Sequence, residues 1–451
     1  MPGGREPPRT GTPPALRPVT VRTHTLANAF EILCVERPGL PLIDLHLYVR
    51  AGADADPVDV PGRASMVAEL LEEGAGERSG LEIANAIDSM GALHSVSAGW
   101  DAAVLAFHAL APRLDEALGL LADLAMRPRF PEAEVRRRRE VRLASILQQR
   151  DEPAFVASRT FAHALYGEDH PYGRPPRGKR ESVTRFDRAV LAAAHDHHYG
   201  AGRAFLIAVG DLSADALFRS AEAVFGPWNG PLATNAQVPA APAARPEIVV
   251  VDRPGAPQSE LRVGCAAVPR VTPDHAALVL LNTILGGAFT SRLNLRLREE
   301  KGYTYGARSR FSFRAGPGPF IIGTAVFTHA TAEAVQDILH EVQRLGEELV
   351  PAVELERAKN YIVLGFPRRL ETGSAIAAHL GELHLHGLAA DELSAFIERV
   401  RAVDAEELRA VAGRTLDPGR MVVAIAGDRT AIEAPLATLG LADVRVAAMP
   451  D

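Results

Sequence analysis

This chain of 451 residues has only two cysteines, Cys34 and Cys265, and both lie in apolar runs typical of strands. Two isolated thiols form neither a disulfide framework nor a cysteine-rich metal site, so buried free thiols are expected. No run of about eighteen apolar residues occurs, so no membrane span is expected. The net charge of −7 lacks the basic excess of a nucleic-acid-binding protein.

The first twenty residues are rich in Pro, Gly and Arg and lack the apolar core of a secretory signal. We therefore expect a cytoplasmic protein, or a periplasmic one if the start site is misassigned. A hydrophobic content of 47% with 23% charged residues is ordinary for a globular protein, and the length predicts two to four domains.

Two short markers recur along the chain. ERPGLP at 36–41 returns as DRPGAP at 252–257, and AVGD at 208–211 returns as IAGD at 425–428, at nearly the same spacing. A repeated order of markers indicates a tandem duplication. Alternating strand patterns mixed with helical ones predict an α+β fold in each copy, with an antiparallel-rich mixed sheet and helices on one side.

A Pro- and Ala-rich stretch separates the copies and has the composition of a linker. The expected organisation is a disordered lead, a first domain, the linker and a second domain, at 1–18, 19–227, 228–246 and 247–451.

The most informative stretch is GGAFTSRLNLRLREEKGYTYGARS, residues 286–309. Gly286 and Gly287 permit a sharp turn or close approach to a substrate chain. A short helix over residues 291–300 is predicted to bury Leu293 and Leu297, four residues apart. Gly302 then ends the helix, and an extended run begins at residue 303.

Two residues on either side of that turn could act on a carbonyl group. Arg298 and Tyr305 are seven residues apart, so both can face one cleft and donate hydrogen bonds to a carbonyl oxygen that gains negative charge. Arg296 and Tyr303 have the same spacing and remain the alternative pair.

This segment resembles the signature of the second domain in the pitrilysin/insulinase family of zinc peptidases. That pattern is a helix ending Leu-Arg-Glu-x-x-Gly, followed by x-x-Tyr, and its Arg/Tyr pair falls on Arg298 and Tyr305. Stretches near 166–173, 199–211 and 367–372 match the family in order. The resemblance implies that two such domains form one half of a hollow clamshell.

Catalytic members of the family carry His-x-x-Glu-His on the first long helix of the first domain. Its two His bind zinc and its Glu is the general base. On the matching helix here these three positions are Ser65, Ala68 and Glu69, and the third ligand falls at Ala144 or Ser145. Such a set offers no strong ligands, so no metal or other cofactor is expected in this chain, and Glu69 is expected to be a solvated helix residue.

Two other groups of histidines occur in the chain. The run at 195–198 lies at a helix end, and His384 and His386 would point to different sides of a helix, so neither is expected to bind metal.

The leading hypothesis is a subunit that is inactive alone and joins a zinc-bearing homologue in a heterodimeric metalloendopeptidase. Its partner would hold the zinc, and this chain would orient the carbonyl of a peptide or unfolded polypeptide. The resemblance leaves two alternatives. One is an inactive structural or assembly protein like the core subunits of the cytochrome bc complex, and the other is a peptide-binding homodimer.

Overall fold

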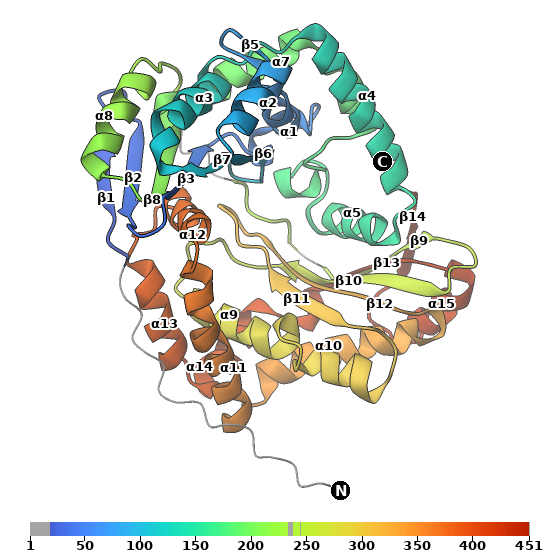
Figure 1. Cartoon of the computed structure of the whole chain (residues 1–451). Helices are drawn as coiled ribbons and strands as arrows, with labels where there is room; N and C mark the ends of the chain where they lie inside the picture. The colour runs from blue at the N-terminus through green and yellow to red at the C-terminus, as the bar shows by residue number, and fades with distance from the viewer. Residues whose placement is uncertain (1–18, 233–237, 244, 451) are drawn as a thin grey trace, which may run out of the picture.

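The computed structural model describes residues 19–232, 238–243 and 245–450. The predicted lead at 1–18 and residues 233–237 and 244 of the predicted linker lie outside the described residues. The described chain forms two halves, each with a six-stranded mixed sheet and helices, so the predicted α+β fold is confirmed (Figure 1).

The first sheet has the strand order β1-β2-β8-β3-β7-β6. β2 and β8 are parallel, and the other neighbours are antiparallel. The central strand β3 is buried along almost its whole length, including Asp44 and His46, because helices cover both of its faces. The bounds of the strands are β1 Arg22–Thr25, β2 Glu31–Glu36, β3 Leu42–Val49, β6 Leu93–Ala98, β7 Ala103–Leu110 and β8 Ala204–Gly210.

The second sheet repeats this order as β14-β9-β13-β10-β12-β11. β9 and β13 are parallel, like β2 and β8, and the edge strand β14 is also parallel to β9. The duplication read from the sequence thus reappears in the strand order, while the stated domain boundaries stay a prediction. The strands are β9 Glu247–Asp252, β10 Gln258–Ala266, β11 Ala307–Phe311, β12 Pro319–Phe327, β13 Val422–Gly427 and β14 Val444–Ala447.

Helices of each half bury the core on the outer face of its own sheet. In the first half they are α1 Arg63–Leu70, α2 Gly80–Ser89, α3 Leu114–Met126, α4 Glu132–Gln149, α6 Arg180–Thr184, α7 Arg188–His198 and α8 Ala214–Phe225. In the second half they are α9 His275–Asn282, α10 Thr331–Glu347, α11 Ala352–Gly365, α13 Glu392–Ala402, α14 Ala405–Thr415 and α15 Arg429–Ala437. The free thiols of Cys34 and Cys265 are buried in these cores, as predicted.

Two equivalent helices are exchanged between the halves. α5 (Pro153–Tyr166) belongs to the first half but lies on β9, β10 and β13, whereas α12 (Gly373–Leu385) of the second half lies on β3 and β8 (Figure 1). A Cβ at Gly381 of α12 would come within 2.2 Å of the Tyr48 ring. The exchange therefore depends on close approach at a glycine, and it fixes the inner face of each sheet against the other half.

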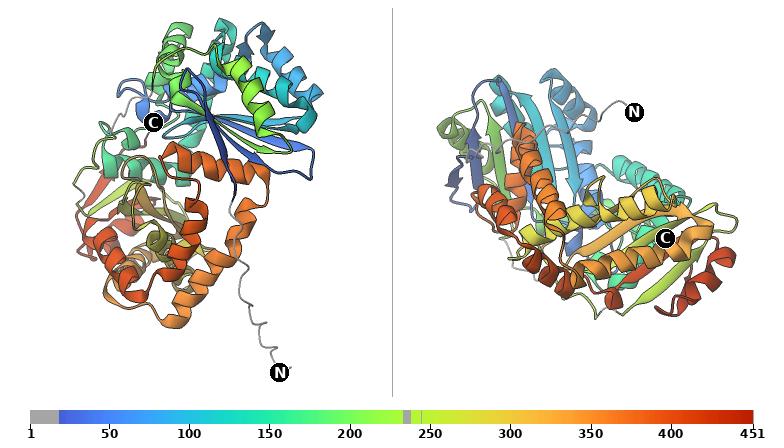
Figure 2. Two further views of the ribbon diagram at one scale, coloured as in Figure 1. Left: turned by 90° about the vertical axis from the view of Figure 1, so that its left-hand side faces the viewer. Right: turned by 90° about the horizontal axis from the view of Figure 1, so that it is seen from below.

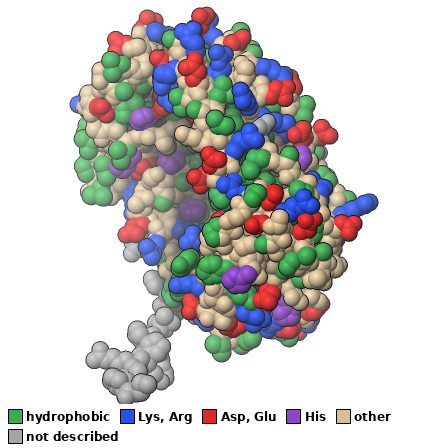
Figure 3. All heavy atoms as spheres, turned by 90° about the vertical axis from the view of Figure 1, so that its right-hand side faces the viewer, with side chains coloured by type: hydrophobic (Ala, Val, Ile, Leu, Met, Phe, Trp, Pro, Cys, Tyr) green, Lys and Arg blue, Asp and Glu red, His purple; other side chains and the backbone are tan. Residues whose placement is uncertain are grey.

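A cationic side chain also joins the halves. Arg314 of the second half is buried, and its guanidinium carbon lies 4.0 Å from the ring centre of Trp100 and 4.3 Å from that of Tyr172, both in the first half. Views from two further sides show α12, in orange, against the blue strands of the first sheet, and the space-filling view shows a hollow between the halves (Figures 2 and 3). Among the described residues no helix is long and apolar enough to cross a membrane. The cytoplasmic location stays a prediction.

Candidate functional site

The segment 286–309 folds as a helical turn that leads into the edge strand β11. Its helix is a π-helical turn, η7, over Asn294–Glu300, and Leu293 and Leu297 are fully buried as predicted. The extended run starts later than expected, because β11 begins at Ala307. Thr304 explains the delay, since its hydroxyl donates to the Gly306 carbonyl and accepts from the Gly306 N–H in a tight local turn.

Arg298 and Tyr305 are both available to a second molecule. The Tyr305 side chain is 88% exposed, and its hydroxyl has no hydrogen-bond partner among the described residues. The guanidinium of Arg298 lies 4.7 Å from the ring centre of Phe289 and 3.5 Å from Glu299, in a partly exposed position. Neither residue is held by a buried network, so both keep hydrogen-bond donors for a ligand.

The alternative pair is already engaged within the chain. Arg296 donates two hydrogen bonds to Asp337 of α10, at 2.9 and 3.0 Å, and the Tyr303 hydroxyl donates to Glu333 on the same helix. That bond raises the pKa of Tyr303 to about 12. Arg296 and Tyr303 therefore anchor the segment to α10, which favours Arg298 and Tyr305 as the pair that faces a ligand.

Gly286 has a packing role in this fold. It is buried in the π-helical turn η6 (Thr283–Gly287), where a Cβ would come within 2.9 Å of three atoms of Ser309 on β11. Gly287 is exposed, and a Cβ there would crowd Asn282. The two glycines thus let η6 pack against the edge strand, and contact between them and a substrate stays a prediction.

The zinc-equivalent positions on α1 are occupied by an ion-pair network. Arg142 of α4 is 1% exposed, and its Nη2 lies 2.6 Å from Glu69 Oε1. Its Nη1 donates to Ser65 Oγ at 3.0 Å and to the Arg177 carbonyl at 2.7 Å. Burial lowers the pKa of this guanidinium, and the Glu69 carboxylate opposes that effect. The guanidinium thus contacts both residues at the positions predicted to correspond to the two histidines.

This arrangement corrects the expectation for Glu69. Its side chain is 29% exposed and paired with Arg142, with Arg177 at 3.4 Å as a second cation, so it is not a freely solvated helix residue. Ala68 is buried and Ala144 is exposed, and neither has a side chain that binds metal. A hydroxyl, one carboxylate and a buried cation do not fit zinc, which needs three neutral or anionic protein ligands.

Arg142 was missed by the sequence analysis, although a signal was present. The buried residues of α4 are Val135, Arg142 and Ile146, whose spacings of seven and four mark one face of a helix. A charged residue at a core position of this face predicts a buried partner. Across the described residues no group of three or more His, Cys, Asp and Glu side chains is placed to hold a metal ion.

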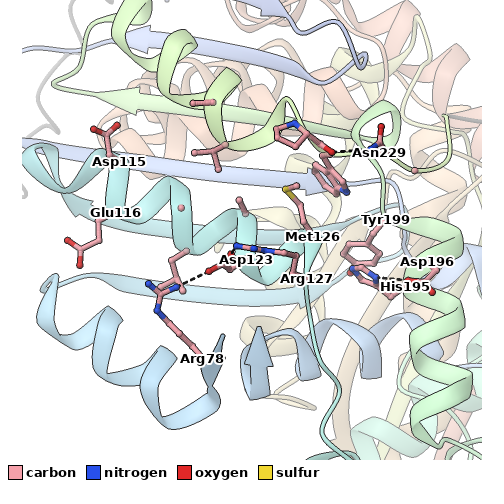
Figure 4. A pocket seen from close by; sticks show the side chains of 18 residues that line it. Arg78, Asp115, Glu116, Asp123, Met126, Arg127, His195, Asp196, Tyr199 and Asn229 are labelled. Atoms are coloured by element: carbon pink, nitrogen blue, oxygen red, sulfur yellow. Dashed lines mark hydrogen bonds and ion pairs between the residues drawn. The ribbon is translucent and has the colours of Figure 1, made fainter. Parts of the chain in front are cut away.

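A hollow of about 900 Å³ lies on the outer, helix-covered side of the first half (Figure 4). Two of its arginines, Arg78 and Arg127, both pair with Asp123 in the wall of the hollow. The buried His195 ring stacks on Tyr199 with centres 4.5 Å apart, and its Nε2 lies 2.9 Å from the Ala125 carbonyl. The first histidine of the run at 195–198 is thus used in packing, as a helix-end residue.

Two family models match the chain. The model described as insulinase (peptidase family M16) matches residues 32–175, and the one described as peptidase M16 inactive domain matches residues 185–362. The chain belongs to peptidase family M16. The predicted resemblance is therefore confirmed, and the second matched range contains Arg298 and Tyr305.

Similar proteins of this M16 family cover nearly the whole chain. An uncharacterized zinc protease of Mycobacterium tuberculosis is 27% identical over 405 residues, which is 88% of this chain and 90% of the relative. One of Streptomyces coelicolor is 24% identical over 404 residues, 87% of this chain and 86% of the relative.

Solved structures agree with this picture. A peptidase M16 inactive domain from Pseudomonas fluorescens superposes with a TM-score of 0.86 at 28% identity, covering 91% of this chain and 98% of that one. A protease from Helicobacter pylori has a TM-score of 0.82 at 19% identity, with 90% and 99% covered, and shows likeness of fold.

Proposed function

We propose that this chain is the metal-free subunit of a two-chain M16 peptidase. It binds a peptide and orients the carbonyl to be attacked, and a homologous partner with His-x-x-Glu-His supplies the zinc and the general base. The observation that carries the proposal is the state of Tyr305, an exposed tyrosine whose hydroxyl has no partner among the described residues, and Arg298 of the same segment is also partly exposed.

The contrast between the two Arg/Tyr pairs supports these roles. The hydrogen bonds from Arg296 and Tyr303 to α10 fix the backbone from which Arg298 and Tyr305 project. A donor that is fixed by its backbone but unbonded at its tip is preorganised for a developing charge. Tyr305 would donate to the carbonyl oxygen, and Arg298 would supply a second donor with a fixed positive charge.

The network around Arg142 supports the absence of a metal role in this chain. Ser65, Ala68 and Glu69 present one carboxylate, and that carboxylate is already paired with a cation. No step of hydrolysis is therefore assigned to α1. The partner would hold the zinc, which would supply the activation of water for hydrolysis, and this chain would bind and orient the carbonyl.

The first sheet offers a free edge for an extended peptide. The Gly99 N–H, next to the β6–β7 turn, donates to the Ala102 carbonyl. The N–H and C=O groups of successive residues in a strand point to opposite sides, so those of His94 and Val96 point away from β7. Within the described residues these groups have no backbone partner. Addition of a strand here would bind a peptide through its main chain and tolerate many sequences.

Purification with a zinc-bearing M16 homologue tests the proposal. Each chain would be assayed alone and mixed against a quenched fluorescent peptide, and the expected result is turnover by the mixture that exceeds the sum of the separate activities. Complex formation without any gain in turnover would support a scaffold role instead. Self-association with peptide binding but no partner would support the homodimer.

A further inference from the structure

A cavity of about 280 Å³ lies beyond the end of β11 in the second half. Its walls come from β11, α9, α12, α13 and the 3₁₀ turn η9 (Phe366–Leu370). We call it the aromatic–arginine pocket, and its defining residues are Arg310, Phe311, Phe313, Phe366, Arg369 and Phe396.

The apolar part of the pocket consists of packed rings. Phe311 stacks on Phe313 with centres 5.6 Å apart, and Phe366 lies 5.7 Å from Phe396. His275 joins the two pairs, because its ring lies 4.8 Å from Phe313 and 5.4 Å from Phe396. This lining suits a large apolar or aromatic side chain.

The charged part of the pocket has an excess of cations. Both carboxylates are already paired, Glu382 with Arg270 at 2.8 Å and Glu392 with Arg399. Arg310 and Arg369 also line the pocket, and neither has an acidic partner among the described residues. Two guanidinium groups beside apolar rings, with no counter-charge, form a site for a carboxylate.

Two further observations agree with an anionic ligand. Partial burial lowers the pKa of Arg310, and the nearby Arg262 adds to the effect, as expected for a cation without an anion. Burial, helped by Arg270 and Arg399, lowers the pKa of His275 to about 3, so this ring stays neutral. Its buried Nδ1 has no hydrogen-bond partner within the described chain, which leaves one more polar atom for a ligand.

We propose that the aromatic–arginine pocket binds the C-terminal residue of a peptide, whose carboxylate pairs with Arg310 and Arg369 and whose apolar side chain packs on the phenylalanines. The proposal rests on the proposed function only in taking the ligand to be the peptide substrate. The pocket also lies along the same segment as Tyr305, which precedes Phe311 by six residues.

This position relates the pocket to the site of cleavage. β11 extends over Ala307–Phe311, begins two residues after Tyr305 and ends at the pocket. A peptide whose carbonyl lies at Tyr305 and whose chain follows β11 would therefore place its C-terminus in the pocket, so cleavage by the mixed complex is expected a few residues from the C-terminus of the substrate.

Binding to the isolated chain tests the pocket without the partner or zinc. The probe is a fluorescein-labelled hexapeptide of five alanines and a terminal phenylalanine, measured by fluorescence anisotropy. Arg310→Gln with Arg369→Gln should raise its Kd at least tenfold, since charge-assisted bonds to a carboxylate are lost. The matched control is Arg308→Gln with Arg368→Gln, neighbouring arginines that are as exposed as Arg310 and Arg369 but do not line the pocket, and it should change Kd by less than about twofold because these side chains lie outside the binding site.

Three competitors define the ligand. The same peptide with an amidated C-terminus, or with terminal lysine, should bind at least tenfold more weakly than the free acid ending in phenylalanine. N-acetylphenylalanine alone should also compete weakly. Equal binding of the amide would overturn carboxylate recognition, and equal binding of N-acetylphenylalanine would make this a small-acid site. Since no turnover is involved, failure here leaves the two-chain hypothesis standing, and failure of that hypothesis leaves this result standing.

Discussion

Arg142 of α4 lies 2.6 Å from Glu69 of α1, at the place where catalytic M16 chains are expected to hold zinc. In a zinc-bearing chain the metal would connect these two helices, whereas here the buried guanidinium of Arg142 does so. The positive charge between α1 and α4 therefore belongs to the protein itself and does not depend on a metal ion taken up from solution.

Breaking this pair should destabilise the first half. Glu69→Gln leaves the buried guanidinium without its carboxylate, and loss of one partner of a buried ion pair costs about 3–5 kcal/mol. Because Glu69 is 29% exposed, we expect the lower end of that range. Urea unfolding gives the value. The double variant Glu69→Met/Arg142→Met should recover most of the loss, and a double variant as unstable as the single one would contradict the argument.

Introducing the His-x-x-Glu-His motif alone should not make this chain bind zinc. With Ser65→His, Ala68→Glu and Glu69→His in place, Arg142 still puts a buried cation beside the new ligands, and we expect less than one tenth of a zinc per chain. Adding Arg142→Ala and Ser145→Glu removes the charge and supplies a third ligand from the same side of α4, so binding should rise towards one zinc. Elemental analysis after dialysis measures both, and full occupancy with Arg142 intact would refute the prediction.

The half-buried carboxylate of Asp54, near α1, should make stability fall as pH rises. Burial, with Asp101 nearby, raises the pKa of Asp54 to about 7. The folded chain therefore holds this proton between about pH 4 and 7 while the unfolded chain releases it, so this residue's contribution is lost as pH rises through that window. Asp54→Asn should stabilise the chain more at pH 8 than at pH 5. Urea unfolding at both values is the measurement, and Asp59→Asn on the exposed neighbouring loop is the control.

Local patterns in the sequence predicted a large part of the fold. Alternating patterns mixed with helical ones gave the α+β fold of each half, and the spacing of Leu293 and Leu297 gave their buried face. The Arg/Tyr segment was found because its residues are adjacent in sequence. The exchange of α5 and α12 could not be found this way, because it depends on contacts between residues far apart in the sequence, such as Tyr48 and Gly381.

The same reason explains what was missed at the site. Glu69 looks like a solvated residue until Arg142, 73 positions later, is placed against it. Tyr303 and Tyr305 look equivalent in sequence, and only the position of Glu333 on α10 separates them. Side chains joined through tertiary contacts leave no periodic signal, except where a charged residue such as Arg142 occupies a core position.

The two tyrosines give the sharpest test of the proposed function. Tyr305→Phe removes one exposed hydroxyl that has no partner among the described residues, so the stability of the chain should stay within about 0.5 kcal/mol of wild type. If this hydroxyl donates to the carbonyl as charge develops on oxygen, kcat of the mixed complex should fall on the order of 10²–10³.

Tyr303→Phe is the matched control, because the same atom is removed two residues away. It breaks the hydrogen bond to Glu333 and should cost about 1 kcal/mol of stability while kcat falls by less than about fivefold. The measurement is kcat and KM of the mixed complex, with assembly checked by size-exclusion chromatography for each variant. A large loss of kcat at Tyr303 and none at Tyr305 would assign the role to the other pair. Unchanged kcat at both positions would leave the chain as a scaffold, since a scaffold presents these side chains to its partner but not to the reacting carbonyl.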